Sequence, residues 1–524
     1  MLENIGKRIN KDYVYLLTAA ILMLFPVIEL DYLFADVLAI RISTIVKFIV
    51  LPALILIVFL LYEKNKKKVF IFTLIYGVIL GLYYLAHCKN AAKIFETIFF
   101  PWNFYFSDYQ ELVYLLTLVI PLFYIYVAYA IDIKEKTIAM ITMVTSVLIS
   151  FPILIGDLFC FGYSTYYQYT RGNIFTWFKN DFNNYTRLPK YYSSKFFFEE
   201  GNTIGIVLFI ILPLLYYFFY KEEKKKPKIM LGVLIFVQTI SMFILGTRIS
   251  SYGAILVPAV LFAGYIALML IKKYQFDKIF LCFTSVLAII SMLILPYSPA
   301  YQTQNIGKDD ISFIGSEVDL QHANHEMLLR EISEKDLKPG TPEYLNFYIY
   351  YFENNAFLIG LTPPIYYTSW YDYRQDPKFW VDFIFEYEFY ERVNARQLER
   401  IFMDYKWDQT DTLTKVLGMG YSTFMNGSIL WEKDFGQQFY TFGYLGFALI
   451  MVPYLAALGY CILKVILDKK RWTFKNYCFL LGIGFGYVAG YVSGHTFDQF
   501  NTSLLLAILI GYMIKEFRSE QYEK

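Results

Sequence analysis

Cysteine is scarce in this sequence, and its cysteines form no recognisable site. Five cysteines occur among 524 residues, with no CxxC pair and no metal-ligand spacing. The net charge is only +2, so the charge balance gives no indication of a nucleic-acid partner, and none is expected. No repeat of fixed period stands out. We expect three of them to lie in or near helices, where a cysteine usually behaves as a small buried hydrophobic residue.

Charged residues are also missing from long stretches of the chain. Hydrophobic residues make up 57% of the sequence, and the mean hydropathy is +0.42. The apolar residues fall into blocks of about 17–25, which matches a bilayer core of roughly 30 Å at about 1.5 Å per helical residue. Lipid offers no partner for backbone polar groups, which excludes open sheets. The predicted fold is therefore an all-α, polytopic transmembrane helical bundle.

The blocks predict about twelve transmembrane helices. The first block is long and is followed by further spans, so we expect a true helix rather than a cleavable signal peptide. The helices are predicted near residues 13–31, 44–62, 69–87, 112–131, 137–156, 203–220, 228–246, 252–271, 279–297, 439–464, 474–493 and 500–515.

Lysine and arginine in the short connections predict the orientation. Basic residues cluster in the connections at 63–68, 221–228, 272–278 and 467–471, whereas the alternate short connections are nearly bare of them. An even number of spans places all the basic connections on one side. Both termini are therefore predicted to be cytoplasmic, in a multi-pass protein of the bacterial cell membrane.

Three parts of the chain follow from this orientation. Residues 1–297 hold the first nine helices, with extracytoplasmic loops at 88–111 and 157–202. Residues 298–438 form a large extracytoplasmic loop domain, which contains 22 Asp and Glu against 12 Lys and Arg and should be partly helical. Residues 439–524 hold the last three helices and a short cytoplasmic tail.

Arg248 is a first candidate for function. It lies in the sequence GTRIS, in a tight turn on the side where basic residues are otherwise scarce. A charged residue near the bilayer interior is costly, which argues for a specific use. The arginine either snorkels to lipid headgroups or grips a phosphate at the membrane surface, because a guanidinium matches a phosphate with two hydrogen bonds.

Three more arginines recur at helical spacing in the large loop. Arg392, Arg396 and Arg400 are four residues apart in a helix-like pattern over 386–405, which predicts that they share one helix face. Nearby glutamates make a solvated, ion-paired helix the simple interpretation. The alternative is a basic stripe that engages an anionic, lipid-linked substrate.

Polar residues flank two of the last helices. Glu432 and Asp434 precede the tenth helix, where a carboxylate either faces the helix dipole or acts as a general base. His495 follows Gly494 near the last helix, and it is either an interface residue or part of a site. The loop at 157–202 is dense in aromatic and amide side chains, which suit either sugar binding or a position among lipid headgroups.

Several stretches together resemble the O-antigen polymerase and O-antigen ligase family of membrane proteins. The stretch 199–215 is similar to the family's asparagine-containing helix start, and 243–257 to its small-residue, arginine and glycine motif. The stretch 394–422 resembles the segment in which an arginine precedes a Gly-x-Gly turn. The stretch 432–447 resembles the helix start with G-x-x-G, and 493–509 the Gly-His motif of Gram-positive relatives.

The resemblance implies a site and a reaction. The family's arginines correspond to Arg248 and Arg396. Its catalytic histidine is absent, and Glu432 stands in that place, with Asp434 as a rival. The resemblance implies no cofactor and no metal. The residues expected to bind substrate are Asn202, Arg392, Arg400, Asp434 and His495.

The implied reaction is glycosyl transfer at the outer leaflet from a polyprenyl-diphosphate-linked oligosaccharide, with inversion. A polymerase extends a surface polysaccharide such as a capsule, an exopolysaccharide or an O-antigen-like chain, whereas a ligase uses another acceptor. The composition is typical of an AT-rich Gram-positive genome, which favours the polymerase. The expected partners are the lipid-linked glycan, membrane lipid, and a flippase and chain-length regulator of the same pathway.

A flippase for lipid-linked saccharide and a scaffold for an assembly complex are the rival interpretations. A flippase should line its spans with ionisable residues. The spans are nearly free of charge, with Lys47 as the main exception and Glu29 near a helix end.

Overall fold

The computed structural model describes eleven segments of the chain, in which helices predominate and no named strand occurs. An isolated bridge pairs Tyr163 with Tyr169. The fold is all-helical, as predicted. The described residues are 10–63, 65–98, 105–165, 169–178, 189–272, 276–305, 315–356, 365–392, 394–426, 431–492 and 494–519.

The chain divides into two compact units. Unit 1 comprises Met1–Tyr76, Leu115–Asn305 and Ile450–Lys524, and unit 2 comprises Gly77–Tyr114 and Ile306–Leu449. The large polar loop of the sequence therefore falls mainly in unit 2, together with the second half of the third predicted span.

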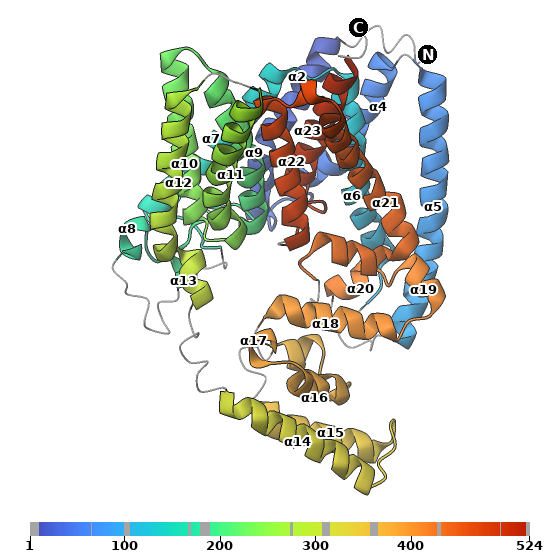
Figure 1. Cartoon of the computed structure of the whole chain (residues 1–524). Coiled ribbons are helices and arrows are strands. Elements are labelled where there is room, and N and C mark those ends of the chain that lie inside the picture. Colours follow the sequence, from blue (N-terminus) through green and yellow to red (C-terminus); the bar gives the residue numbers. More distant parts are fainter. Residues whose placement is uncertain are drawn as a thin grey trace. The chain divides into compact units, whose positions relative to one another are not determined.

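Eleven helical stretches of the described residues are long and apolar enough to cross a membrane. They confirm a polytopic bundle of about the predicted size (Figure 1). The stretches are α2 with η1 (Lys11–Phe34), α3 to α4 (Ile42–Tyr62), α5 (Lys66–Thr97), α6 (Asp108–Ala130), α7 (Glu135–Leu158), α9 (Gly201–Lys221), α10 (Lys225–Ile244), α11 (Arg248–Lys272), α12 to α13 (Lys278–Thr303), α21 (Asp434–Leu467) and α23 (Phe500–Ser519).

The eleventh predicted span, 474–493, is also a helix, α22 (Phe474–Val492), but it does not reach the hydropathy of the eleven stretches above. Four glycines, three tyrosines, Lys475 and Asn476 lower its hydropathy. The glycines permit close packing, because a methyl group on Gly482 would lie 2.6 Å from the backbone oxygen of Ile210 in α9. Small residues of this kind let transmembrane helices approach each other closely.

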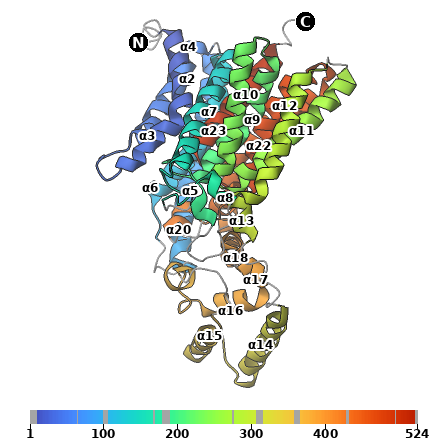
Figure 2. The same ribbon diagram turned by 90° about the vertical axis from the view of Figure 1, so that its left-hand side faces the viewer.

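Helix α9 is the central helix of unit 1. Its side chains from Thr203 to Phe219 are all buried. Helices α7, α10, α11, α22 and α23 pack around it, and Figure 2 shows several of them running alongside it. An apolar helix buried on all sides is expected at the centre of a membrane bundle.

The two ends of unit 1 differ in chemistry. At one end, Lys221 and Lys475 both pair with Glu135, at 2.6 and 3.1 Å, which brings together the end of α9 and the starts of α22 and α7. The predicted basic connections 221–228 and 467–471 adjoin these helix ends. At the other end lie the starts of α9, α11 and α23 and the end of α2.

Unit 2 contains a helical region with an aromatic core. Tyr348, Phe352, Trp380 and Phe402 are almost fully buried in it. Aspartate and threonine side chains cap several of its helices, as expected from N-cap preferences. Its helices are α14 (Gly315–Glu334), α15 (Pro342–Asn355), α16 (Pro377–Glu386), α17 (Phe389–Arg392), α18 (Ala395–Asp408), α19 (Thr412–Leu417) and α20 (Tyr421–Asn426).

Two helix boundaries differ from the sequence prediction. Helix α5 continues to Thr97, ten residues beyond its predicted end, because His87, Asn90 and Ile94 are buried along one face. Residues 88–97, which were predicted to belong to an outer loop, are therefore helical. Helix α21 begins at Asp434 and is broken at Gly443, where φ is +65° and ψ is −174°.

Candidate functional site

An ion pair joins two of the predicted site residues in unit 2. Asn394 adopts an extended conformation, and α18 begins directly after it, which places Arg396 in the first turn. Arg396 donates hydrogen bonds from Nε, at 2.8 Å, and from Nη2, at 2.6 Å, to Oε2 of Glu432. The side chains are 27% and 41% exposed, so both are accessible to a ligand.

Two further cations, Arg400 and Lys433, lie near this pair. Arg400 lies one turn beyond Arg396 on α18 and pairs with Asp404 at 3.4 Å. Partial burial lowers the pKa of the Lys433 ammonium, and the nearby charges of Arg400 and Arg396 lower it further. The three cations lie among the carboxylates of Glu432, Asp404 and Glu399, so an anion such as phosphate would bind here in exchange for a carboxylate.

The predicted basic stripe of three arginines is wrong. Arg392 ends the short helix α17, and α18 starts at Ala395, so the chain between them does not continue as one helix. The physical cause is Asn394, which takes the extended conformation typical of an N-cap and so ends the helical run. Arg392 is completely buried, whereas Arg396 and Arg400 share an accessible face of α18.

The two carboxylates before the tenth span have different environments. Asp434 is the first residue of α21 and is 1% exposed. A buried carboxylate at a helix start is stabilised by the positive end of the helix dipole. Glu432 lies outside the helix and is within reach of solvent.

The Gly-x-Gly turn of the sequence packs directly against the break in α21. The N–H groups of Met419 and Gly420 each donate a 3.0 Å hydrogen bond, to the carbonyl oxygens of Tyr440 and Thr441 respectively. A break in a helix leaves the carbonyl groups before it without their usual N–H donors. A buried carbonyl group must then accept a hydrogen bond from another part of the chain. Gly418 has φ of +92°, and a methyl group there would lie 2.1 Å from the oxygen of Thr441.

A buried polar network holds this turn in place. His87 Nδ1 lies 2.7 Å from the Leu417 oxygen, and His87 Nε2 lies 3.1 Å from Glu111. The other oxygen of Glu111 accepts hydrogen bonds from the N–H and the hydroxyl of Ser422, at 2.6 and 2.8 Å. Asn90 donates to the Gly418 oxygen at 3.2 Å.

This network was not predicted from the sequence. His87 and Asn90 are three residues apart near the end of an apolar block, and this spacing was the available signal. A polar pair on one face of a transmembrane helix indicates a buried partner, because lipid provides none. The partners could not be named, since Glu111 and Ser422 are separated by 311 residues.

The remaining predicted residues lie in unit 1. Arg248 is the first residue of α11 and is exposed, and Asn202 is half-buried in the first turn of α9. A methyl group on Gly205 would contact Thr247 and Ser250, which places these two helix starts together. His495 Nδ1 lies 3.1 Å from Asp498 just before α23. The predicted site residues thus form two groups, one in each unit.

The aromatic loop before α9 has both buried and exposed rings. Trp177 is fully buried and donates to the Tyr192 oxygen at 3.1 Å. Phe159, Phe175 and Tyr169 are each more than two-thirds exposed. Exposed aromatic rings at the end of a membrane bundle are typical of the lipid–water interface.

Comparison with known families identifies the chain. A sequence profile described as "O-antigen ligase like membrane protein" matches residues 11–520, which is nearly the whole chain. The chain belongs to the O-antigen ligase-like membrane protein family. No curated protein and no solved structure matches it.

Membership of the O-antigen ligase-like family confirms the resemblance seen in the sequence. The family consists of multi-pass membrane proteins, in agreement with the helical bundle. It implies an activity of the ligase or glycosyltransferase type on a lipid-linked glycan.

Proposed function

We propose that this protein polymerises polyprenyl-diphosphate-linked oligosaccharide units into a surface polysaccharide at the extracytoplasmic face of the cell membrane. The observation that carries the proposal is the accessible Arg396–Glu432 ion pair, with Arg400 and Lys433 nearby. The pair combines an anion-binding group and a proton acceptor in direct contact. Transfer of a glycan from a diphosphate requires both.

The proposed reaction begins when the donor diphosphate displaces Glu432 from Arg396. A guanidinium binds phosphate as well as carboxylate, so the exchange keeps Arg396 satisfied while it frees Glu432. Arg396 then stabilises the charge that develops on the leaving diphosphate. Arg248, in unit 1, is proposed to be a further anion-binding residue.

The freed Glu432 acts as the general base. It takes the proton from an acceptor sugar hydroxyl, whose oxygen forms a bond to the anomeric carbon of the donor. The bond between that carbon and the diphosphate oxygen breaks, and the polyprenyl diphosphate leaves with the electron pair. Attack from the side opposite the leaving group inverts the anomeric centre.

The distribution of charge in unit 1 supports the proposed orientation. The basic connections gather at the end where Lys221 and Lys475 pair with Glu135. Connections rich in lysine and arginine stay on the cytoplasmic side of a membrane. We therefore propose that the end of unit 1 with Lys221 and Lys475, and both termini of the chain, are cytoplasmic. Arg248, Asn202 and His495 lie near helix starts at the opposite end of the unit.

Reconstitution with a lipid-linked repeat unit tests the proposal. A ladder of products on the carrier lipid is expected. Transfer to a different added acceptor without a ladder would identify a ligase instead, and no transfer with either acceptor would favour a flippase or a scaffold.

Three variants test the site assignment. Arg248→Ala, Arg396→Ala and Glu432→Gln should each abolish long products while the protein remains in the membrane. Arg330→Ala is the matched control, because Arg330 forms an exposed 2.7 Å ion pair with Glu334 in the same unit as Arg396. Products of normal length from all three variants would overturn the assignment.

A further inference from the structure

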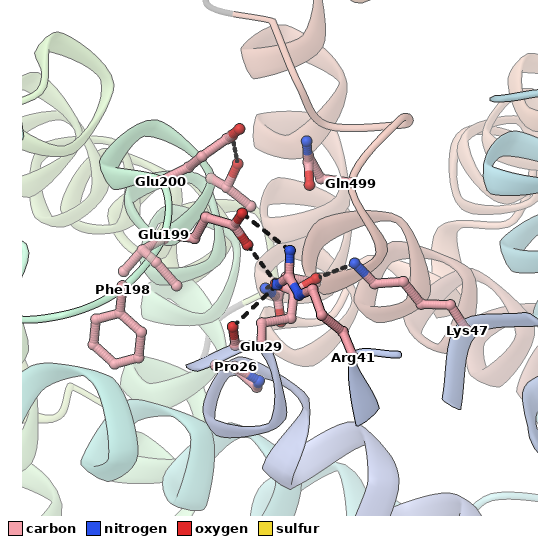
Figure 3. Close-up of a pocket in the computed structure, with 11 residues that line it drawn as sticks. Pro26, Glu29, Arg41, Lys47, Phe198, Glu199, Glu200 and Gln499 are labelled. Atoms are coloured by element: carbon pink, nitrogen blue, oxygen red, sulfur yellow. Dashed lines mark hydrogen bonds and ion pairs between the residues drawn. The ribbon is translucent and has the colours of Figure 1, made fainter. Parts of the chain in front are cut away.

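A second polar site occurs in unit 1, at the end of the bundle where Asn202 and His495 also lie. A cavity of about 170 Å³ opens between the end of α2, the start of α9 and the start of α23. Its walls include Glu29, Arg41, Lys47 and Glu200, together with Asn501. Figure 3 shows Glu29, Arg41, Lys47 and Glu199 grouped along one side of the cavity, with Gln499 apart from them.

The cations of this cavity are already paired with carboxylates. Arg41 donates to both oxygens of Glu199, at 3.2 and 2.8 Å, and to Asp31 at 3.1 Å. Lys47 pairs with Glu29 at 2.6 Å. These contacts leave the guanidinium few donors for a phosphate, so the cavity is a poor site for the diphosphate.

Hydrogen-bond acceptors exceed donors around the cavity. Asn501 is 8% exposed and donates to Glu29, while its side-chain oxygen has no hydrogen-bond partner among the described residues. A buried acceptor of this kind costs about 1–3 kcal/mol unless a ligand or water satisfies it. Among the described residues, the Glu200 carboxylate accepts a hydrogen bond from the hydroxyl of Thr203 alone, at 3.0 Å.

The formal charge of the lining is negative. The carboxylates Glu29, Glu199 and Glu200 outnumber the cations Arg41 and Lys47, three to two. A metal ion would face two ammonium or guanidinium groups at close range, which disfavours it. An acidic ligand would be repelled by the excess of carboxylates over cations.

The backbone around Lys47 departs from the regular α-helix. Lys47 lies in the π-helical segment Val46–Val50, between α3 and α4. Segments of this type are rare and are often found at functional sites. A charged lysine within an otherwise apolar span costs free energy, so such a residue usually has a pairing partner and a functional role.

We propose that this cavity binds one sugar ring of the glycan and accepts a neutral or amino sugar in preference to an acidic one. This inference rests on the proposed function, which supplies a saccharide at this end of the protein. Sugar hydroxyls donate to Glu29, Glu200 and the free oxygen of Asn501, and they accept from Lys47. The volume equals that of about six water molecules, which is comparable to one pyranose ring.

Direct binding to the purified full-length protein tests the site. Saturation-transfer NMR in nanodiscs would compare glucose, glucosamine and glucuronate. Glucose and glucosamine should bind, and glucuronate should bind at least about tenfold more weakly. Asn501→Ala should weaken glucose binding by about tenfold, because a buried acceptor for a hydroxyl is lost.

A charge-specific variant separates recognition from a loss of folding. Glu200→Gln keeps the shape of the side chain and removes one negative charge, so it should narrow the preference for glucosamine over glucuronate. Asn476→Ala is the matched control, since Asn476 is a buried amide at the other end of the unit, bonded to the Arg471 oxygen. The control should bind all three sugars as the unmodified protein does.

The possible outcomes separate this inference from the proposed function. Absence of saturable sugar binding, equal binding of glucuronate, or binding unaffected by Asn501→Ala and Glu200→Gln would each overturn the sugar site. Normal polymerisation together with such a result would leave the proposed function standing. Sugar binding that behaves as expected, without any product from a lipid-linked donor, would overturn the polymerase instead.

Discussion

Arg396 contacts a single carboxylate oxygen of Glu432 with two of its nitrogens, from a helix that lies 36 residues earlier in the chain. The arrangement satisfies both groups in the absence of a ligand. It also holds them where a phosphate could replace the carboxylate. The distinction between a structural pair and a catalytic pair can therefore be tested by exchange of the two residues.

The exchange variant Arg396→Glu/Glu432→Arg should form no long product, although it preserves an ion pair. The positions of the anion-binding group and the base are reversed, so neither can perform its role. Thermal stability should change little, because exposed ion pairs contribute about 0.2–1 kcal/mol. The measurement is product length in vitro beside a thermal melt, and recovery of polymerisation by the exchange would show that the pair is only structural.

Gly418→Ala should destabilise the protein severely. The residue has φ of +92°, and a methyl group there would lie 2.1 Å from the Thr441 oxygen, so the turn would have to leave the broken helix α21. The variant should unfold at a lower temperature than the unmodified protein and should accumulate in the membrane in a smaller amount. Gly459→Ala is the control, because that glycine lies within the helix and has nothing within 4 Å of the added methyl group. Equal behaviour of the two variants would contradict this account of the turn.

Glu111→Ala should destabilise the protein by roughly 3–5 kcal/mol, the range for removal of one partner of a buried pair. Glu111 is fully buried, and its loss leaves Ser422 and His87 without the acceptor they share. Thermal unfolding in detergent measures the effect. Glu96→Ala removes an exposed carboxylate from α5 and should be close to neutral. A small effect for Glu111→Ala would mean that water replaces the carboxylate.

Lys406 should make the stability of unit 2 depend on pH. Burial lowers the pKa of its ammonium to about 8, and Asp376 offsets part of this effect. The unfolded lysine keeps its proton up to about pH 10. Between these values the unfolded state binds more protons, so stability rises with pH. Below about pH 8 both states are protonated, and the buried charge is a constant cost.

Lys406→Met provides the comparison. The stability of the natural protein should rise relative to the variant by up to about 1.4 kcal/mol per pH unit between about pH 8 and 10. Denaturant unfolding across this range measures the difference. Parallel curves for the two proteins would show that Lys406 does not change its protonation on folding.

The membrane character of this protein could be predicted from the sequence because it depends on local composition. The length of each apolar block and the lysines between blocks predicted about twelve helices. Eleven described stretches are long and apolar enough to cross a membrane, and the remaining predicted span, α22, is also helical. The family motifs likewise depend on short stretches. Arg396 and Glu432 were selected from such motifs, and the structure brings them into contact.

The sequence did not predict what depends on contacts between distant segments. The break at Gly443 is stable because the Gly418–Gly420 turn supplies hydrogen bonds to the exposed carbonyls, and no local signal reveals that partner. Arg392 was misplaced because the spacing of four residues takes no account of the extended conformation of Asn394.

By itself, the sequence determined the class of fold and the approximate number of helices, since bilayer thickness constrains each segment independently. Only the tertiary structure decided which polar residues meet. It paired Arg396 with Glu432, His87 with Glu111, and Lys47 with Glu29. These choices follow from the requirement that a buried polar group find a partner, and that partner can lie hundreds of residues away.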